Sequence, residues 1–112
     1  MLGLQIISAS FQEVQFRAVA QFNHHLSSKR GYKIAWKPMT LASAQWRLDR
    51  VAVNFIRHQL TNYDSVIVML GRDAERIRSV RLEILGAIAV AYPQVADECG
   101  RQAFLTRLRL VL

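Results

Sequence analysis

The sequence predicts a mainly α-helical protein, built as a small bundle of three main helices with one or two short helices. Apolar residues recur at spacings of three and four over long stretches, which is the period of amphipathic helices. Two prolines and five glycines are the few breaks in the 112 residues, and residues typical of helix caps precede the apolar stretches. Hydrophobic residues make up 52% of the chain, which is enough for a folded core. We therefore expect one helical domain over residues 1–112.

The first helix is expected to begin at Ser10. The stretch SFQE, from Ser10 to Glu13, has the form of a capping box, in which Glu13 reaches back to the Ser10 amide. Residues 27–31 are expected to end this helix, and residues 29–38, KRGYKIAWKP, form a basic, aromatic connector. Residues 33–37 of the connector permit a short strand, since proline at position 38 disfavours a helical conformation before it. The expected apolar face of the helix contains Phe11, Val14, Ala18, Val19, Phe22 and Leu26.

The second helix is expected over about residues 41–60, with Thr40 or Ser43 as its cap. At about 100° per residue, its apolar and polar residues separate onto two sides. His58 falls on the border between them. The apolar side holds Leu41, Ala44, Leu48, Val51, Ala52, Phe55 and Ile56, and the polar side holds Arg47, Arg50, Asn54 and Arg57. We interpret the polar side as a face in contact with solvent.

The remaining elements are a short segment, a third long helix and a tail. Residues 65–70, SVIVML, suit either a short helix, which Asp64 would cap, or a buried strand. Asp73 is a cap for a helix over about residues 74–91, which ends before Pro93. The tail, residues 101–112, permits a helix or a strand, and we favour a helix. The core face of the third helix is expected to contain Ile77, Val80, Ile84, Leu85, Ile88 and Ala91.

Arg81 is expected near the middle of that apolar face, where a charged side chain needs a partner or a path to water. An ion pair with Asp64 or Asp49 is the interpretation that we favour. The alternative is that another subunit contacts this face.

Positive charge is concentrated in the first half of the chain. The net charge is +7, and the 35 residues between Glu13 and Asp49 contain six cations and no acidic residue. A basic protein of this kind attracts polyanions, of which nucleic acid is the first candidate. Arginine outnumbers lysine twelve to three, which favours recognition of phosphate and carboxylate groups. Aromatic residues stand among the cations, as contacts to both phosphates and bases would require. The candidate nucleic-acid-binding residues are Arg17, Lys29, Arg30, Lys33, Trp36, Lys37, Arg47, Arg50 and Arg57.

Other interpretations of these residues stay open. Trp36 and Trp46 would also suit the edge of the core, with the cations exposed only because such residues usually are. An acidic protein partner would also suit a basic face. On a helix, Trp46 and Arg50 lie four residues apart, so their side chains are expected to stack.

Residues 54–64, NFIRHQLTNYD, contain the densest group of side chains able to do chemistry. In a functional interpretation, His58 acts as acid or base, Tyr63 or Asp64 orients it, and Arg57 binds an anion. In a structural interpretation, Arg57 and His58 complement the helix dipole, and Asp64 caps the next element or pairs with Arg57. We favour the structural interpretation. No glycine-rich phosphate loop and no zinc-protease or serine-hydrolase motif occurs in the sequence, so we expect no catalytic residues.

We expect neither a metal ion nor a cofactor. Cys99 is the single cysteine, which excludes an internal disulfide and a zinc site built from cysteines. His24 and His25 are adjacent, so on a helix they point about 100° apart rather than to one metal. The N-terminal stretch MLGLQIISASFQ lacks the basic residues of a secretory signal, and no apolar stretch is long enough to cross a membrane. We expect a cytoplasmic protein that does not enter a membrane.

Part of the chain resembles a known family. Residues 55–64, FIRHQLTNYD, are followed by GRD at residues 71–73 and by VRLEI at residues 80–84. These residues resemble a family of uncharacterised proteins, bacterial among others, with the pattern I-R-H-x-x-T-x-Y-D, a glycine-containing turn and a further helix. The resemblance covers roughly residues 50–91 and implies no catalytic role, since the family has no assigned activity.

The function that we expect from the sequence is a small basic helical binding module. It would contact nucleic acid or form part of a nucleoprotein assembly. The alternative is a protein–protein interaction or self-assembly element, a homo-oligomer included, with no catalytic activity.

Overall fold

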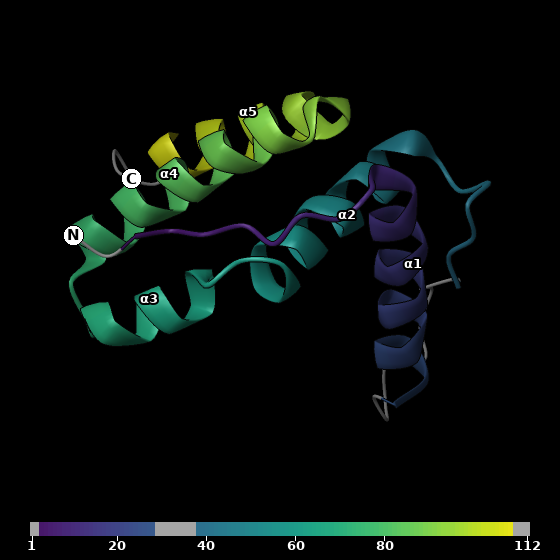
Figure 1. Cartoon of the computed structure of the whole chain (residues 1–112), viewed down its shortest axis with the longest axis horizontal. Coiled ribbons are helices and arrows are strands. Elements are labelled where there is room, and N and C mark those ends of the chain that lie inside the picture. Colours follow the sequence, from purple (N-terminus) through teal and green to yellow (C-terminus); the bar gives the residue numbers. More distant parts are fainter. Residues whose placement is uncertain (1–2, 29–37, 109–112) are drawn as a thin grey trace.

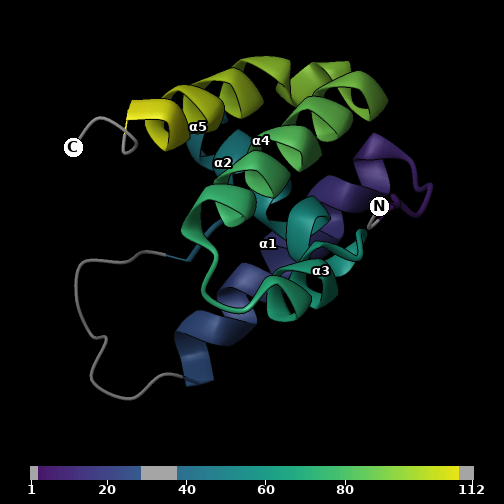
Figure 2. The same ribbon diagram turned by 90° about the vertical axis from the view of Figure 1, so that its left-hand side faces the viewer.

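The computed structural model describes residues 3–28 and 38–108, and it confirms a mainly α-helical fold. α2 is the central helix, since it packs against α1, α3, α4 and α5. α4 and α5 lie side by side as a helical hairpin, while α1 and α3 lie near opposite ends of α2 (Figure 1). The view in Figure 2 shows the α4–α5 hairpin as one layer, with α1 and α3 on the other side of the molecule. The elements in order are α1 (Phe11–Ser28), α2 (Gln45–Gln59), α3 (Tyr63–Leu70), α4 (Ala74–Ala91), the 3-10 helix η1 (Pro93–Val95) and α5 (Ala96–Leu108).

The core lies where α1, α2, α4 and η1 meet. The predicted core face of α4 is confirmed at Ile84, Leu85 and Ile88, which are fully or almost fully buried. Leu41 is exposed instead of buried, because α2 begins after it. The largest fully buried side chains are Ile56, Ile84, Leu85, Ile88, Val14, Val53 and Val95. They come from four different elements, so the core fixes how the helices stand relative to one another.

Two of the predicted helix starts are confirmed. The Ser10 hydroxyl oxygen accepts a hydrogen bond from the Glu13 amide at 3.1 Å, as a capping residue should. The Glu13 carboxylate does not complete the expected capping box; it lies 3.8 Å from the Arg17 guanidinium instead. The Asp73 carboxylate accepts from the Arg76 amide at 3.1 Å and caps α4.

The start of α2 differs from the prediction. The Thr40 amide donates to the Ser43 hydroxyl at 3.0 Å, and the Ser43 amide donates to the Thr40 carbonyl at 3.0 Å. These bonds close a turn of their own, so neither residue caps the helix, which starts at Gln45. Polar side chains that satisfy a turn are no longer available as caps one or two residues later.

The N-terminal segment crosses the molecule and is fastened to the loop between α2 and α3 (Figure 1). The Ile7 amide donates to the Leu60 carbonyl at 2.7 Å, and Ile6 and Thr61 form an isolated antiparallel bridge. The Asn62 side chain donates to the Gly3 carbonyl and accepts from the Gln5 amide, both at 2.8 Å. Residues 60–62, near the end of the NFIRHQLTNYD stretch, therefore hold the N-terminal segment against the loop between α2 and α3.

The two ambiguous segments are both helical. Residues 65–70 belong to α3, which starts at Tyr63 after Asn62, so Asp64 is not its cap. The described part of the tail, residues 101–108, forms a helix, as favoured, and this helix begins at Ala96, which is earlier than expected. The possible strand at residues 33–37 lies outside the described residues. Within residues 3–28 and 38–108, each helix is too short or too polar to cross a lipid bilayer.

Candidate nucleic-acid interface

Four adjoining hollows follow the surface where α1, α2, α4 and α5 meet, and each shares residues with the next. The first lies beside Trp46, the second beside His58, the third at Arg57 and the fourth beside Arg78. Among the described residues, Asp64 is the one carboxylate that lines any of them. Six arginines line them, and we call this set the arginine track: Arg47, Arg50, Arg57, Arg78, Arg81 and Arg101.

The central hollow, which we call the Arg57 pocket, has a volume of about 220 Å³ and lies between α2, α4 and α5. Arg50, Asn54 and Arg57 stand at i, i+4 and i+7 on α2, so they project from one side of that helix. Arg81 enters from α4, and α5 supplies Arg101, Gln102, Leu105 and Thr106. Three helices, α2 and the α4–α5 hairpin, thus bring four arginines to one pocket.

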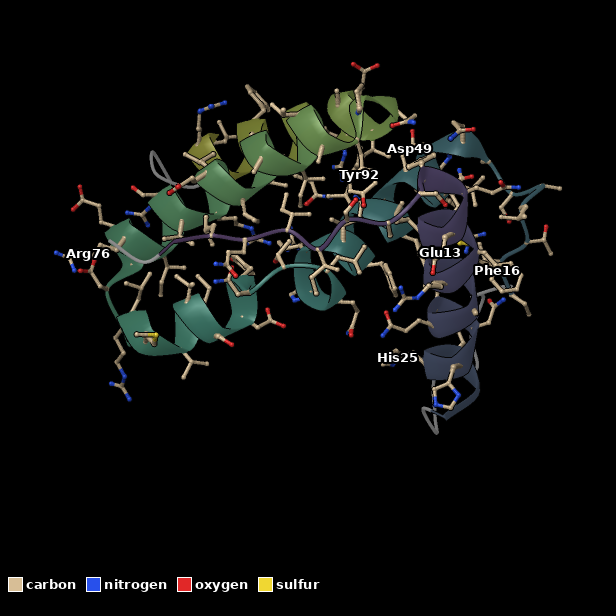
Figure 3. All side chains as sticks on the ribbon, viewed as in Figure 1. Glu13, Phe16, His25, Asp49, Arg76 and Tyr92 are labelled. Atoms are coloured by element: carbon tan, nitrogen blue, oxygen red, sulfur yellow. The ribbon has the colours of Figure 1, made fainter. Side chains whose placement is uncertain are left out.

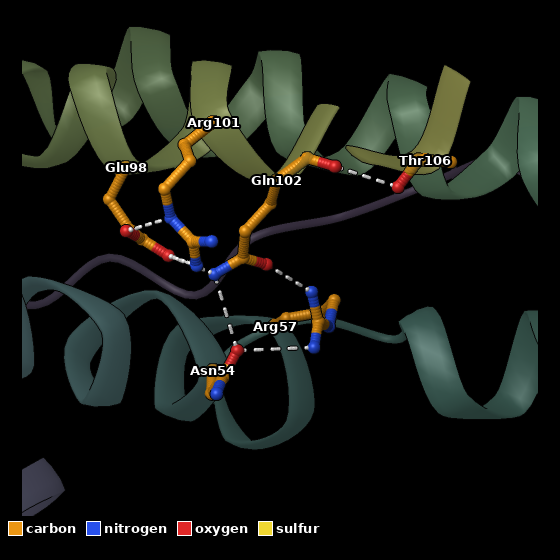
Figure 4. Close-up of polar contacts among 6 residues, drawn as sticks. All are labelled: Asn54, Arg57, Glu98, Arg101, Gln102 and Thr106. Carbon is orange, nitrogen blue, oxygen red and sulfur yellow. Dashed lines mark hydrogen bonds and ion pairs between the residues drawn. The ribbon is translucent and has the colours of Figure 1, made fainter. Parts of the chain in front are cut away.

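Arg57 is the most unusual of these arginines, because it is only 6% exposed. Its Nη1 donates to the Gln102 Oε1 at 2.9 Å, and its Nη2 donates to the Asn54 Oδ1 at 3.2 Å (Figure 4). The guanidinium carbon also lies 5.7 Å from the centre of the Tyr63 ring. Its Nε is buried and has no hydrogen-bond partner among the described residues. Neutral amides therefore hold Arg57 in place, and among the described residues no carboxylate forms an ion pair with it, although the charge of Asp64 favours its charged form from a distance.

The burial of Arg57 corrects the prediction of a solvated face on α2 at this residue, while Arg50 on the same face is exposed as expected. α5 packs over this side of α2, and Gln102 on α5 reaches Arg57. Asp64 does not pair with Arg57 either, because its carboxylate binds His58. The sequence of α2 has the pattern of an amphipathic helix, and this pattern does not indicate that a second helix covers part of the polar side.

Arg81 faces another arginine where an ion pair was expected. Burial lowers the pKa of Arg57 below its ordinary value, and the positive charge of Arg81 lowers that pKa further. The two proposed partners of Arg81 are engaged elsewhere: Asp49 accepts from Gln45 at 2.7 Å, and Asp64 binds His58. Within the described ranges, no carboxylate forms an ion pair with Arg81. Two like charges next to each other raise the positive potential of the pocket.

Glu98 balances one of the four pocket arginines. This carboxylate is 7% exposed and accepts from the Arg101 Nε at 2.9 Å, the Arg101 Nη2 at 2.7 Å and the Gln102 Nε2 at 2.7 Å (Figure 4). Burial raises the pKa of Glu98, but the hydrogen bonds from Arg101 and Gln102 outweigh burial and leave the pKa below its ordinary value. Glu98 also fixes the Gln102 amide that holds Arg57, and the Thr106 hydroxyl donates to the Gln102 carbonyl at 2.8 Å.

The predicted binding residues divide into three groups. Arg47 and Arg50 lie on the arginine track, and the Arg50 guanidinium lies 5.9 Å from the centre of the Trp46 ring, which confirms the expected stacking. Trp46 is 62% exposed, so it does not belong to the core. Arg17 lies apart from the track, close to Glu13 and 5.2 Å from the centre of the Phe55 ring. Lys29, Arg30, Lys33, Trp36 and Lys37 lie outside the described residues.

His58 and Asp64 form a hydrogen-bonded pair beside the track. Their Nδ1 and Oδ1 atoms are 2.7 Å apart, and both side chains are partly exposed at the hollow that contains His25 of α1. Figure 3 shows His25 near the end of α1, far from Arg76 at the opposite end of the molecule. The Thr61 hydroxyl donates to the Arg57 carbonyl, so this part of NFIRHQLTNYD ends α2. No group of three or more histidine, cysteine or acidic residues that could hold a metal occurs in residues 3–28 and 38–108.

Cys99 is buried on α5, next to Glu98, and its thiol should be unreactive in the folded protein. Its side chain is 2% exposed, and burial, with a smaller contribution from Glu98, raises the pKa of the thiol to about 11. We expect a thiol reagent at pH 8 to label Cys99 at least about 100-fold more slowly in the native protein than in guanidinium chloride, since only the thiolate reacts. Rapid labelling of the native protein would contradict the packing of α5 against α2 and α4.

The chain matches no protein-family model, no curated protein and no solved structure. The family resemblance over residues 50–91 therefore stays a prediction. The proposed function below is therefore based on the geometry of the arginine track.

Proposed function

We propose that the protein binds nucleic acid, with phosphates of the strand along the arginine track, and that it does so without catalysis. The observation that carries this proposal is Arg57, a buried arginine that rests on two neutral amides and faces Arg81. A buried charge is costly unless an opposite charge balances it. A phosphate group of a bound strand would supply that opposite charge.

The surroundings of the pocket support a strand rather than an isolated anion. The arginines continue on both sides of the pocket, to Arg47 in one direction and to Arg78 in the other. Trp46 is exposed beside Arg50 and offers a flat surface for a base. Stacking of bases on aromatic rings together with arginine contacts is typical of single-strand binding.

The test is a salt titration of binding to mixed-sequence oligonucleotides, single-stranded and double-stranded, followed by fluorescence anisotropy. We expect the logarithm of the affinity to fall linearly with the logarithm of the salt concentration. With about four phosphates contacted, affinity for a single strand should fall about 50-fold between 50 and 200 mM salt. The proposal fails if no oligonucleotide binds at low salt, or if salt leaves the affinity unchanged.

A second candidate function is a protein–protein interaction or self-assembly element. The specific support is the exposed apolar side chains of the α4–α5 hairpin, which are Val90 on α4 and Phe104 and Leu108 on α5. Sedimentation equilibrium would test it, since self-assembly predicts a mass above 12.8 kDa that rises with concentration. A constant mass of one chain would count against self-assembly.

A further inference from the structure

We propose that the Arg57 pocket binds the terminal phosphate monoester of a nucleic-acid strand, while internal phosphodiesters contact the rest of the arginine track. This inference rests on the proposed function and assigns the pocket a ligand of its own. The protein would then recognise phosphorylated strand ends, and it would bind the internal part of the strand with less selectivity.

The first argument is charge. Four arginines line the pocket and Glu98 balances Arg101, so three positive charges have no carboxylate in contact among the described residues. An internal phosphodiester brings a single negative charge. A terminal monoester brings about 1.5 to 2 negative charges at pH 7 and three acceptor oxygens. The monoester therefore balances the charge of the pocket more completely.

The second argument is the burial of Arg57. Arg57 is almost fully buried, and it lines a pocket of about 220 Å³. A group must enter the pocket to approach it. An internal phosphodiester has a sugar on each side and lies along a surface, whereas a terminal monoester has one substituent and can enter end-on.

The third argument is that the pocket is fixed in advance. Glu98 holds Gln102, and Gln102 and Asn54 each accept a hydrogen bond from Arg57. A guanidinium held in one orientation suits the defined geometry of a phosphate group. On a non-specific charged surface, by contrast, arginine side chains are expected to extend into water without hydrogen bonds to neighbouring amides.

The experiment compares three internally labelled oligonucleotides of one sequence, with a 5′-phosphate, a 3′-phosphate or neither, on the full chain. We expect one phosphorylated strand to bind about tenfold more tightly than the unphosphorylated strand. Arg81→Gln should remove most of this preference, because it weakens binding of the phosphorylated strand more than binding of the unphosphorylated strand. The matched control, Arg72→Gln, removes the same charge from an exposed site outside the four hollows and should keep the preference.

A second arm uses inorganic phosphate against chloride at equal ionic strength. Phosphate should raise the melting temperature of the wild-type protein and reduce the preference for the phosphorylated strand, and Arg81→Gln should weaken both effects. If all three strands bind equally, the inference is overturned and the proposed function stands. If phosphate stabilises the protein but no strand binds, both the proposed function and the strand end as ligand are overturned.

Discussion

Replacing Ile88 with alanine should lower the free energy of unfolding by about 2–5 kcal/mol. Ile88 is completely buried on α4, within the apolar cluster that α1, α2, α4 and η1 share. The shortened side chain loses its contacts and leaves a cavity that the surrounding helices close only in part. Small domains are stable by about 5–15 kcal/mol in total, so this loss is a large fraction. Urea denaturation followed by circular dichroism measures it.

Val90→Ala is the matched control for this prediction. Val90 lies two residues further along the same helix but is 83% exposed. Its replacement should change the free energy of unfolding by no more than about 0.5 kcal/mol. Equal effects at the two positions would show that α4 presents a different side to the core.

Replacing Glu98 with glutamine should have opposite effects on stability and on binding. The glutamine nitrogen cannot accept the hydrogen bonds from Arg101 and Gln102 that Glu98 accepts, and a charge-assisted pair is lost. The free energy of unfolding should fall by about 1.5–3 kcal/mol. Oligonucleotide affinity should rise, because Arg101 then adds an unbalanced charge to the pocket, while the preference for a terminal phosphate should weaken, because Gln102 is held less firmly. Glu83→Gln removes an exposed carboxylate from α4 and should affect stability little.

The stability difference between the wild-type protein and Glu98→Gln should depend on pH. The pKa of Glu98 is lower in the folded protein than its ordinary value. Its contribution is therefore present above the ordinary pKa of a glutamate and is lost as the pH falls through the lowered value. Denaturation at pH 7 should show the full difference, and the difference should shrink as the pH falls below about 4. A difference that stays constant to pH 3 would contradict the role of the ionised carboxylate.

Much of the fold could be predicted because it depends on local patterns. The spacing of Ile84, Leu85 and Ile88 specifies a core face, and Ser10 and Asp73 cap their helices through bonds to residues three positions away. Where local signals compete, the prediction was wrong. Thr40 and Ser43 bond to each other instead of capping α2, and no periodicity distinguishes these two outcomes.

The candidate site could be predicted only in part. Arg47 and Arg50 were found from the acid-free stretch and from the stacking of Trp46. The sequence places the charge of Arg81 within an apolar helix face, which indicates that this side chain has an unusual environment. It predicts an ion pair there, whereas the structure has a pocket that Arg57 also lines. Arg101 and Gln102 gave no signal, because their role depends on how α5 packs against α2, which is a contact between distant parts of the chain.

The most direct test of the central claim asks whether the position of the arginines matters, or only their number. The double variant Arg50→Gln/Arg81→Gln removes two charges from the arginine track, and Arg72→Gln/Arg107→Gln removes two exposed charges outside it. The measured quantity is the slope of the logarithm of affinity against the logarithm of salt concentration, for the terminally phosphorylated single strand that the wild-type protein binds more tightly. We predict that the track variant lowers the magnitude of this slope by about 1.4, and that the other variant leaves it nearly unchanged. Equal slopes for the two variants would contradict binding along the track.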